Sequence, residues 1–169
     1  MSSIELERLR AIRLVALDID GVLSDGVVSV DEEGRQQRHF DIKDGLGIVR
    51  LVESGRRVIV ISSSSSTAGV ERLRTLGIDP VLTGVKDKLQ ALSAEVAALN
   101  VEWSAVAYMG DDLPDIRCLE AAGVSSAPAD AVETIRQMVD IVMSRPGGRG
   151  ALRELSDLII SADEAEPGR

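Results

Sequence analysis

The chain has 169 residues, a formal net charge of −9 and only 2% aromatic residues. Negative charge opposes binding to a phosphate backbone, and scarce aromatic side chains leave little for base stacking, so we expect no nucleic-acid partner. No apolar run is long enough to span a bilayer, so we also expect no membrane partner. The single cysteine, Cys118, excludes an intramolecular disulfide and a cysteine zinc site and fits the reducing cytoplasm, where we expect the protein.

The first half of the chain predicts strands that alternate with helices. Residues 14–17 are expected to form a buried strand, and residues 26–42 a β-hairpin around the acidic turn DEEG. Asp44 is a candidate cap for a helix that Gly55 ends. The apolar run RVIVI at residues 57–61 predicts the next buried strand, and a second helix follows it. The hairpin is the one departure from a regular alternation.

The second half continues this alternation, with strands over 79–84, 105–110, 123–128 and 140–144 and helices over 86–100, 111–123, 131–139 and 151–161. Short, almost uniformly apolar strands between helices are typical of a parallel sheet covered on both faces. The predicted fold class is therefore α/β: a Rossmann-like parallel sheet with helices on both faces, a hairpin insertion after the first strand and no cap domain. We expect one domain over residues 1–169, with residues 145–169 as a tail near the active site.

Polar side chains follow the predicted strands where each one ends, and in such sheets ligands bind beyond the carboxyl ends of the strands. The residues in question are Asp18, Asp20, Ser62, Lys86, Lys88, Asp111, Asp112 and Asp115. Carboxylates gathered at one edge repel each other and resist burial unless a cation joins them. Because the available ligands are oxygens, with no histidine or cysteine nearby, the sequence favours Mg²⁺ over zinc.

A divalent cation beside an ammonium and a hydroxyl can hold a phosphoryl group, because phosphoryl transfer needs mainly positioning and charge stabilisation. A carboxylate aimed at phosphorus can act as the nucleophile and form an aspartyl-phosphate. A second carboxylate two residues further on can protonate the leaving oxygen and then activate water. The residues therefore predict phosphoryl-transfer chemistry at this edge.

The motif DIDGVLSDG, the strand-end Ser62, Lys88 and the motif GDDLPD resemble, in this order, the four motifs of the haloacid dehalogenase (HAD) superfamily of phosphatases. The segments FDIKDGLGI, GVKDKL, AYMGDD and RPGGRGALRELSDLI resemble the small capless branch of that superfamily, and the resemblance runs from about Leu14 to Ile160. It implies a Mg²⁺-dependent phosphomonoesterase for a small sugar phosphate. The expected substrate is a sugar acid phosphate of the 3-deoxy-octulosonate 8-phosphate type; the alternatives are a nine-carbon, sialic-type 9-phosphate or another sugar phosphate.

The same resemblance implies roles for the residues after the first strand and around Ser62. Asp18 would be the nucleophile and a Mg²⁺ ligand. Asp20 would be the general acid and base, with its backbone carbonyl on the metal. Ser62 would hold the phosphoryl group, with Ser63 beside it. Ser63 and Ser64 stand where family members usually carry glycine followed by arginine or glutamate.

For the later motifs the resemblance implies a second phosphate-holding residue, Lys88, and a direct Mg²⁺ ligand, Asp111. Asp112 and Asp115 would support the site by holding metal-bound water or by orienting Lys88. Lys86 is a rival to Lys88 because both precede the same predicted helix, but the family pattern DKL favours Lys88.

Several residues leave two interpretations open. Lys43 and Asp44 either face the substrate or cap a helix, and Arg149 and Arg153 either reach the site or form surface pairs. The serines after Ser62 are either a plain loop or capping residues. His39 is expected at the surface and Cys118 in the core.

Two functions other than hydrolysis share some of these residues. A phospho-accepting signalling module also combines acidic residues, Mg²⁺, a serine or threonine and a lysine, but there the lysine usually follows the accepting aspartate. A catalytically silent relative would be expected to lack some of the four motifs. Because a capless site stands open, we expect a closed homo-oligomer in which the hairpins meet between subunits, and the family resemblance implies a homotetramer.

Overall fold

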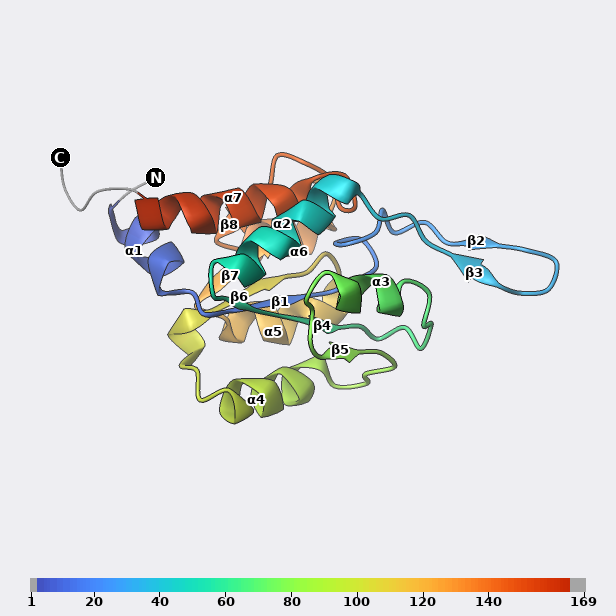
Figure 1. Ribbon diagram of the computed structural model, residues 1–169, viewed down its shortest axis with the longest axis horizontal. Coiled ribbons are helices and arrows are strands. Elements are labelled where there is room, and N and C mark those ends of the chain that lie inside the picture. Colours follow the sequence, from blue (N-terminus) through green and yellow to red (C-terminus); the bar gives the residue numbers. More distant parts are fainter. Residues whose placement is uncertain (1–2, 165–169) are drawn as a thin grey trace.

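The computed structural model describes residues 3–164, and its centre is a six-stranded parallel sheet with the order β5-β4-β1-β6-β7-β8 (Figure 1). The strands are β1 (Leu14–Leu17), β4 (Arg57–Ile61), β5 (Val81–Leu82), β6 (Val106–Met109), β7 (Val124–Ala127) and β8 (Ile141–Val142). All neighbouring pairs are parallel. The expected α/β class with a Rossmann-like parallel sheet is confirmed.

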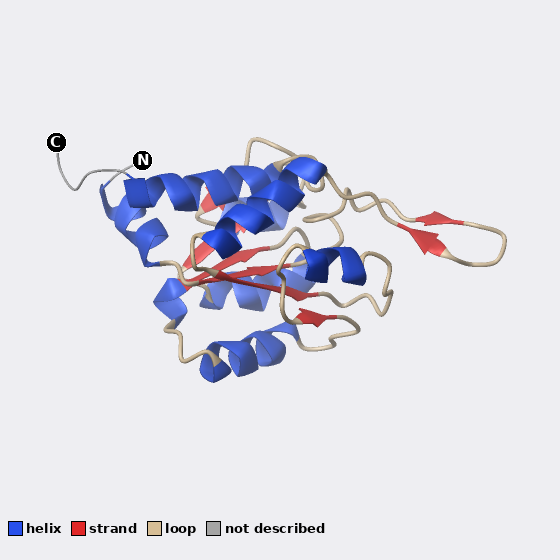
Figure 2. Ribbon diagram, viewed as in Figure 1, coloured by secondary structure: helices blue, strands red, loops and turns tan. Residues whose placement is uncertain are grey.

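Helices cover both faces of the sheet (Figure 2). They are α1 (Ser3–Ala11), α2 (Ile42–Glu53), α3 (Val70–Thr75), α4 (Lys88–Ala98), α5 (Ile116–Ala121), α6 (Glu133–Met138) and α7 (Ala151–Glu164), with short 3₁₀ turns at η1 (Trp103–Ala105) and η2 (Leu113–Asp115). No helix among residues 3–164 combines the length and the apolar character that crossing a bilayer requires.

The central strand β1 shows why both faces need cover. Val15 and Leu17 join the apolar cluster beneath α1, α2 and α7, whereas Leu14 and Ala16 join the cluster over α4, α5 and α6. All four side chains are fully buried. Successive residues of a strand point to opposite faces, so an unbroken apolar strand is the sequence form of a sheet buried on both sides.

Helix α2 begins one turn earlier than the sequence suggested. Asp41 is its N-cap and accepts a hydrogen bond from the amide of Lys43. Asp44 does not cap its own helix: it is buried and accepts hydrogen bonds from the amides of Gly150 and Arg153, at 3.0 and 2.8 Å. It therefore binds the N-terminal turn of α7, a role that local sequence does not reveal.

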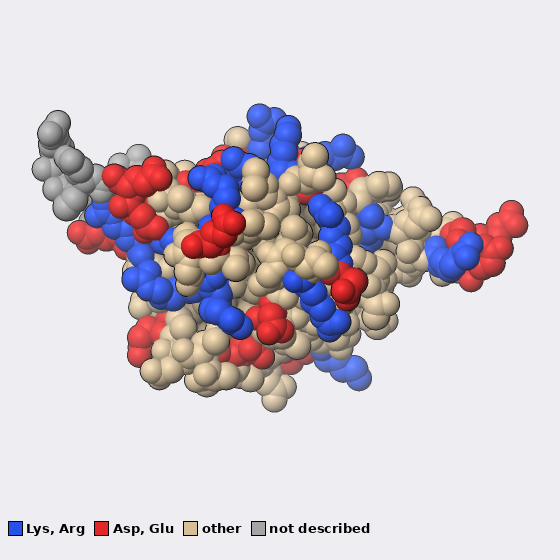
Figure 3. Space-filling view, viewed as in Figure 1, with Lys and Arg blue, Asp and Glu red and all other residues tan. Residues whose placement is uncertain are grey.

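The hairpin projects from the body of the molecule (Figure 1). Its paired strands are shorter than expected, β2 (Ser29–Val30) and β3 (Gln36–Gln37), and both are exposed. A bridge between Ser24 and Phe40 joins its base. The space-filling view shows charged side chains at its tip (Figure 3), where Arg35 pairs with Asp31 and Glu33.

The loop before α7 packs against the loop after β1. The amide of Gly148 donates to the carbonyl of Val22 at 2.9 Å, and Arg149 pairs with Asp25 at 3.1 Å. A Cβ on Gly147 would lie 1.8 Å from the carbonyl oxygen of Gly21, so only glycine permits this approach. The expected C-terminal tail thus reaches the acidic loop with residues 147–149, while its last residues, 165–169, lie outside the described part of the chain.

Candidate active site

The strand order changes direction at β1, because β4 and β5 lie on one side of it and β6, β7 and β8 on the other. Leu17 at the end of β1 is in register with Met109 at the end of β6. Asp18 directly follows Leu17 and Asp111 lies two residues after Met109, so both emerge at the carboxyl edge of neighbouring strands. Open parallel sheets bind their ligands at such a reversal of strand order.

Asp18 and Asp115 share one buried cation, Lys88. Its ammonium nitrogen lies 2.9 Å from Oδ2 of Asp18 and 2.8 Å from Oδ1 of Asp115. Burial lowers the pKa of Lys88, but the two carboxylates outweigh that effect, so its pKa lies above the usual value. Lys88 is therefore a fixed positive charge at the centre of the site.

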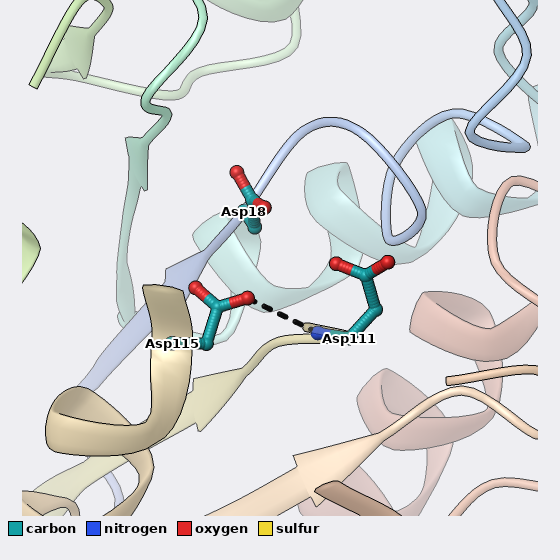
Figure 4. A group of neighbouring side chains, drawn as sticks. All are labelled: Asp18, Asp111 and Asp115. Atoms are coloured by element: carbon teal, nitrogen blue, oxygen red, sulfur yellow. Dashed lines mark hydrogen bonds between the residues drawn. The ribbon is translucent and has the colours of Figure 1, made fainter. Parts of the chain in front are cut away.

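Each carboxylate oxygen of Asp115 accepts two hydrogen bonds. Its Oδ1 accepts from Lys88 and from the hydroxyl of Tyr108 at 2.7 Å, and its Oδ2 accepts from the amides of Asp111 and Asp112. Figure 4 shows the contact with the amide of Asp111. The side chain is fully buried. Asp115 is thus suited to orient Lys88 and the turn that carries Asp111, and it has little capacity left for a metal ion.

The carboxylates of Asp18 and Asp111 have raised pKa values, because both are buried beside other negative charges. Burial, then the charge of Asp115, raises the pKa of Asp18 from 3.8 to about 6. Burial, then the charge of Asp18, raises the pKa of Asp111 from 3.8 to about 7. Clustered carboxylates with raised pKa values are typical of functional sites.

These carboxylates fit a hard divalent cation. One oxygen each from Asp18, Asp111 and Asp115 lies within 4.8 Å of the others (Figure 4). Among the described residues, no donor is hydrogen-bonded to the carboxylate of Asp111. Asp18 and Asp111 are therefore the side chains best placed to hold Mg²⁺, which prefers one or two carboxylates together with water and phosphate oxygens.

Ser62 lies directly after β4 and is buried. It faces a pocket of about 290 Å³ lined by Asp18, Asp20, Gly21, Gly26, Ser62, Ser63, Ser64, Lys88, Asp111, Asp112 and Pro114. The structure thus brings together all but two of the residues that the sequence proposed for catalysis, phosphate binding, metal binding and support, with Asp115 directly behind the pocket.

The two residues that the structure does not bring to this pocket are Lys43 and Asp44. Asp44 binds the start of α7, and Lys43 lines a separate, cationic pocket of about 470 Å³ with Arg145, Arg149 and Arg153. His39 is exposed and Cys118 is buried, as expected.

Sequence reasoning missed Arg38, which lies on the hairpin next to Gln37. Its guanidinium forms two hydrogen bonds to Asp20, at 2.6 and 3.1 Å, and its side chain is only 4% exposed. The pattern of the hairpin gives no signal for this contact, because Arg38 is one of several polar residues in RQQRH.

Comparison with known proteins finds close relatives along nearly the whole chain. The 3-deoxy-D-manno-octulosonate 8-phosphate phosphatase of Yersinia pestis is 37% identical over 163 residues, which cover 96% of this chain and 87% of the relative. The enzyme of the same name from Escherichia coli K12 is 39% identical over 159 residues, covering 92% and 85%. No protein-family model matches the chain.

Solved structures agree with these relatives. The phosphatase of the same name from Moraxella catarrhalis, in complex with magnesium, phosphate and KDO, superposes with a TM-score of 0.91 at 36% identity and covers 95% of this chain and 93% of that one. The parallel sheet and its acidic edge define a phosphatase of the HAD superfamily, as the motifs suggested. Within it, the chain belongs to the family of 3-deoxy-D-manno-octulosonate 8-phosphate phosphatases.

Proposed function

We propose that this protein hydrolyses 3-deoxy-D-manno-octulosonate 8-phosphate, in the cytoplasm and with Mg²⁺, to the free sugar acid and phosphate. The observation that carries the proposal is the position of Asp18: its carboxylate contacts Lys88 at 2.9 Å and lines one pocket with Ser62 and Asp111. The names of the relatives support the substrate, and the buried free thiol of Cys118 fits a reducing compartment.

In the first half of the proposed reaction, Asp18 attacks phosphorus and the bond from phosphorus to the sugar oxygen breaks. Asp20 donates a proton to that departing oxygen. Lys88 and the hydroxyl of Ser62 bind the phosphoryl oxygens and offset their charge. The products are the free sugar and an aspartyl-phosphate on Asp18.

In the second half, Asp20 takes a proton from the attacking water, which releases phosphate and restores Asp18. Bound Mg²⁺ would supply charge neutralisation between the carboxylates and the phosphoryl oxygens. Asp18 and Asp111, with the backbone carbonyl of Asp20, are the proposed ligands. Asp115 holds Lys88 in place, and Asp112 caps the turn η2 by accepting from the amide of Leu113.

Phosphate release from a substrate panel tests this proposal. The panel contains 3-deoxy-octulosonate 8-phosphate, a nine-carbon 9-phosphate, glucose 6-phosphate and nitrophenyl phosphate, each with Mg²⁺ and with EDTA. We expect the highest kcat/KM on the eight-carbon sugar acid and no turnover in EDTA. A higher kcat/KM on the nine-carbon substrate would assign the protein to that substrate class. Equal turnover with Mg²⁺ and with EDTA would contradict the metal-dependent mechanism.

We also propose a closed homotetramer built around the hairpins. Apolar side chains are exposed on the hairpin and on the adjoining first turn of α2, with Val30 at 62% and Ile42 at 77%. Short exposed strands are marginal in water without a partner. The double change of Val27 and Val30 to aspartate leaves Arg38 in place and is expected to give smaller particles in light scattering; an unchanged particle mass would contradict the arrangement.

A further inference from the structure

A buried arginine on an exposed hairpin stands out from its surroundings. The residues on either side of Arg38, Gln37 and His39, are both exposed, whereas the side chain of Arg38 is only 4% exposed. The cost of burying a guanidinium is offset only where its donors are paired. We therefore expect the donors of Arg38 to be paired with acceptors in the folded chain.

Each of the five N–H groups of this guanidinium has an acceptor. Nε and Nη2 donate to the two carboxylate oxygens of Asp20, at 2.6 and 3.1 Å. Nη2 also donates to the hydroxyl of Ser64 at 3.1 Å, and Nη1 donates to the hydroxyl of Ser66 at 2.7 Å. The fifth contact is to the side-chain oxygen of Gln36, at 3.2 Å.

The run of serines after β4 provides a regular support for this contact. The hydroxyl of each even-numbered serine accepts from the amide two residues further on: Ser62 from Ser64, Ser64 from Ser66, and Ser66 from Ala68. Ser64 and Ser66 are half-buried and face Arg38, whereas Ser63 and Ser65 are exposed. Because a hydroxyl oxygen has two lone pairs, Ser64 and Ser66 can accept from the backbone and from Arg38 together.

Asp20 has little else to hold it. Besides Arg38, the described contact of its carboxylate is the hydroxyl of Ser24 at 3.3 Å, and its side chain is 32% exposed. A bidentate arginine fixes the plane of a carboxylate as well as its position. Proton transfer depends on that geometry, because a small displacement of a catalytic group costs much of its contribution.

We propose that Arg38 is a positioning residue for Asp20, and that Ser64 and Ser66 support it. This inference rests on the proposed function, since it assigns Arg38 an effect only through proton transfer by Asp20. Ser64, which stands where family members usually carry arginine or glutamate, thereby serves as an acceptor for a guanidinium that comes from the hairpin.

The first test compares substrates with different leaving groups. Arg38→Gln is expected to lower kcat on the sugar phosphate by roughly tenfold to a hundredfold, a part of the contribution of a general acid, with little change in KM. Nitrophenyl phosphate, whose leaving group needs no proton, should lose far less. Arg38→Lys keeps the charge but not the bidentate geometry and should show the same pattern. Equal losses on both substrates would contradict the inference.

A double-mutant cycle with Asp20→Asn separates positioning from other roles. If Arg38 acts through Asp20, adding Arg38→Gln to the Asp20→Asn variant should change kcat on the sugar phosphate less than twofold. A further large loss of kcat in that background, or a rise of KM in both backgrounds, would overturn the inference in favour of a structural or a substrate-binding role.

Serine variants test the support. Loss of two hydroxyls in Ser64→Ala/Ser66→Ala should lower kcat on the sugar phosphate roughly fivefold, with the same dependence on leaving group. The matched controls are Ser65→Ala in the same run and Arg35→Gln at the hairpin tip, and both should behave as the parent. If the parent is active and the variants of Arg38, Ser64 and Ser66 match it, the inference alone fails; if the parent releases no phosphate from any substrate, the proposed function fails and the inference with it.

Discussion

Two aspartates of one loop, Asp18 and Asp20, are each held by a cation from a distant segment, but the two regions are built differently. Lys88 reaches Asp18 from the first residue of α4, inside a cluster closed by β1, β6 and η2. Arg38 reaches Asp20 from a hairpin whose paired strands are exposed. The first region belongs to the core, so removing its shared cation is expected to lower the stability of the fold. The second region can change while the core stays intact.

The largest expected effect lies in the buried region. Asp18→Asn keeps the shape of the side chain but loses the charge of the nucleophile, so kcat should fall by roughly 10³-fold or more, as when a nucleophile is removed elsewhere. Circular dichroism should show an unchanged fold. Turnover near the parental rate would show that Asp18 is not the nucleophile.

Variants of Lys88 and Arg38 should differ most clearly in their free energies of unfolding. Lys88→Met leaves Asp18 and Asp115 without their shared cation, and the side chains of these residues are only 11% and 1% exposed. Removing one partner of a buried pair costs about 3–5 kcal/mol, so the free energy of unfolding in urea should fall by about that amount.

Arg38→Gln serves as the comparison in the same urea experiment. Asp20 is 32% exposed and regains water when its partner is removed, so the loss of stability should be clearly smaller than for Lys88→Met. Equal losses of unfolding free energy in the two variants would contradict the distinction between a core region and a hairpin region.

The smallest expected effect is the response to pH and Mg²⁺. The pKa values of Asp18 and Asp111 rise on folding from 3.8 to about 6 and about 7, so between these limits the folded state holds more protons than the unfolded state. Their contribution to stability therefore falls as the pH rises from about 4 to 7. Mg²⁺ binds the ionised carboxylates, so its stabilising effect should be larger at pH 8 than at pH 5.

Thermal unfolding with Mg²⁺ and with EDTA measures this response. At a Mg²⁺ concentration a hundredfold above its Kd, binding stabilises by about 2.7 kcal/mol, which corresponds to a rise in Tm of roughly 5–10 °C for a chain of this size. Asp111→Asn should abolish most of the rise at pH 8. A rise as large at pH 5 as at pH 8 would contradict a site made of these two carboxylates.

The core region was predictable from sequence because short apolar runs mark its strands and the polar site residues lie close to the ends of those runs in the chain. The buried strands predicted over residues 14–17 and 57–61 have these bounds in the structure, and Asp18 and Ser62 directly follow them. Parallel strands place their ends at one edge, so Asp18, Ser62 and Asp111 had to meet once the strands were known.

The other contacts depend on segments that only the folded chain brings together. Asp44 was expected to cap a helix or face the substrate, yet it binds the start of α7, more than a hundred residues away in the chain. Arg38 reaches across 18 residues to Asp20 and 26 to Ser64. Nothing in the periodicity of RQQRH distinguishes Arg38 from its exposed neighbours, so neither contact follows from pattern alone.

Residues 147–149 pack against the loop after β1, so this part of the active site is completed late in the synthesis of the chain. The contact between Arg149 and Asp25 joins residues 124 positions apart, so the loop after β1 gains this contact only after most of the chain has been made. During synthesis Asp18, the proposed nucleophile, therefore leaves the ribosome long before the residues that pack against its loop. A chain that ends before residue 147 would therefore lack the contacts that residues 148 and 149 make with this loop.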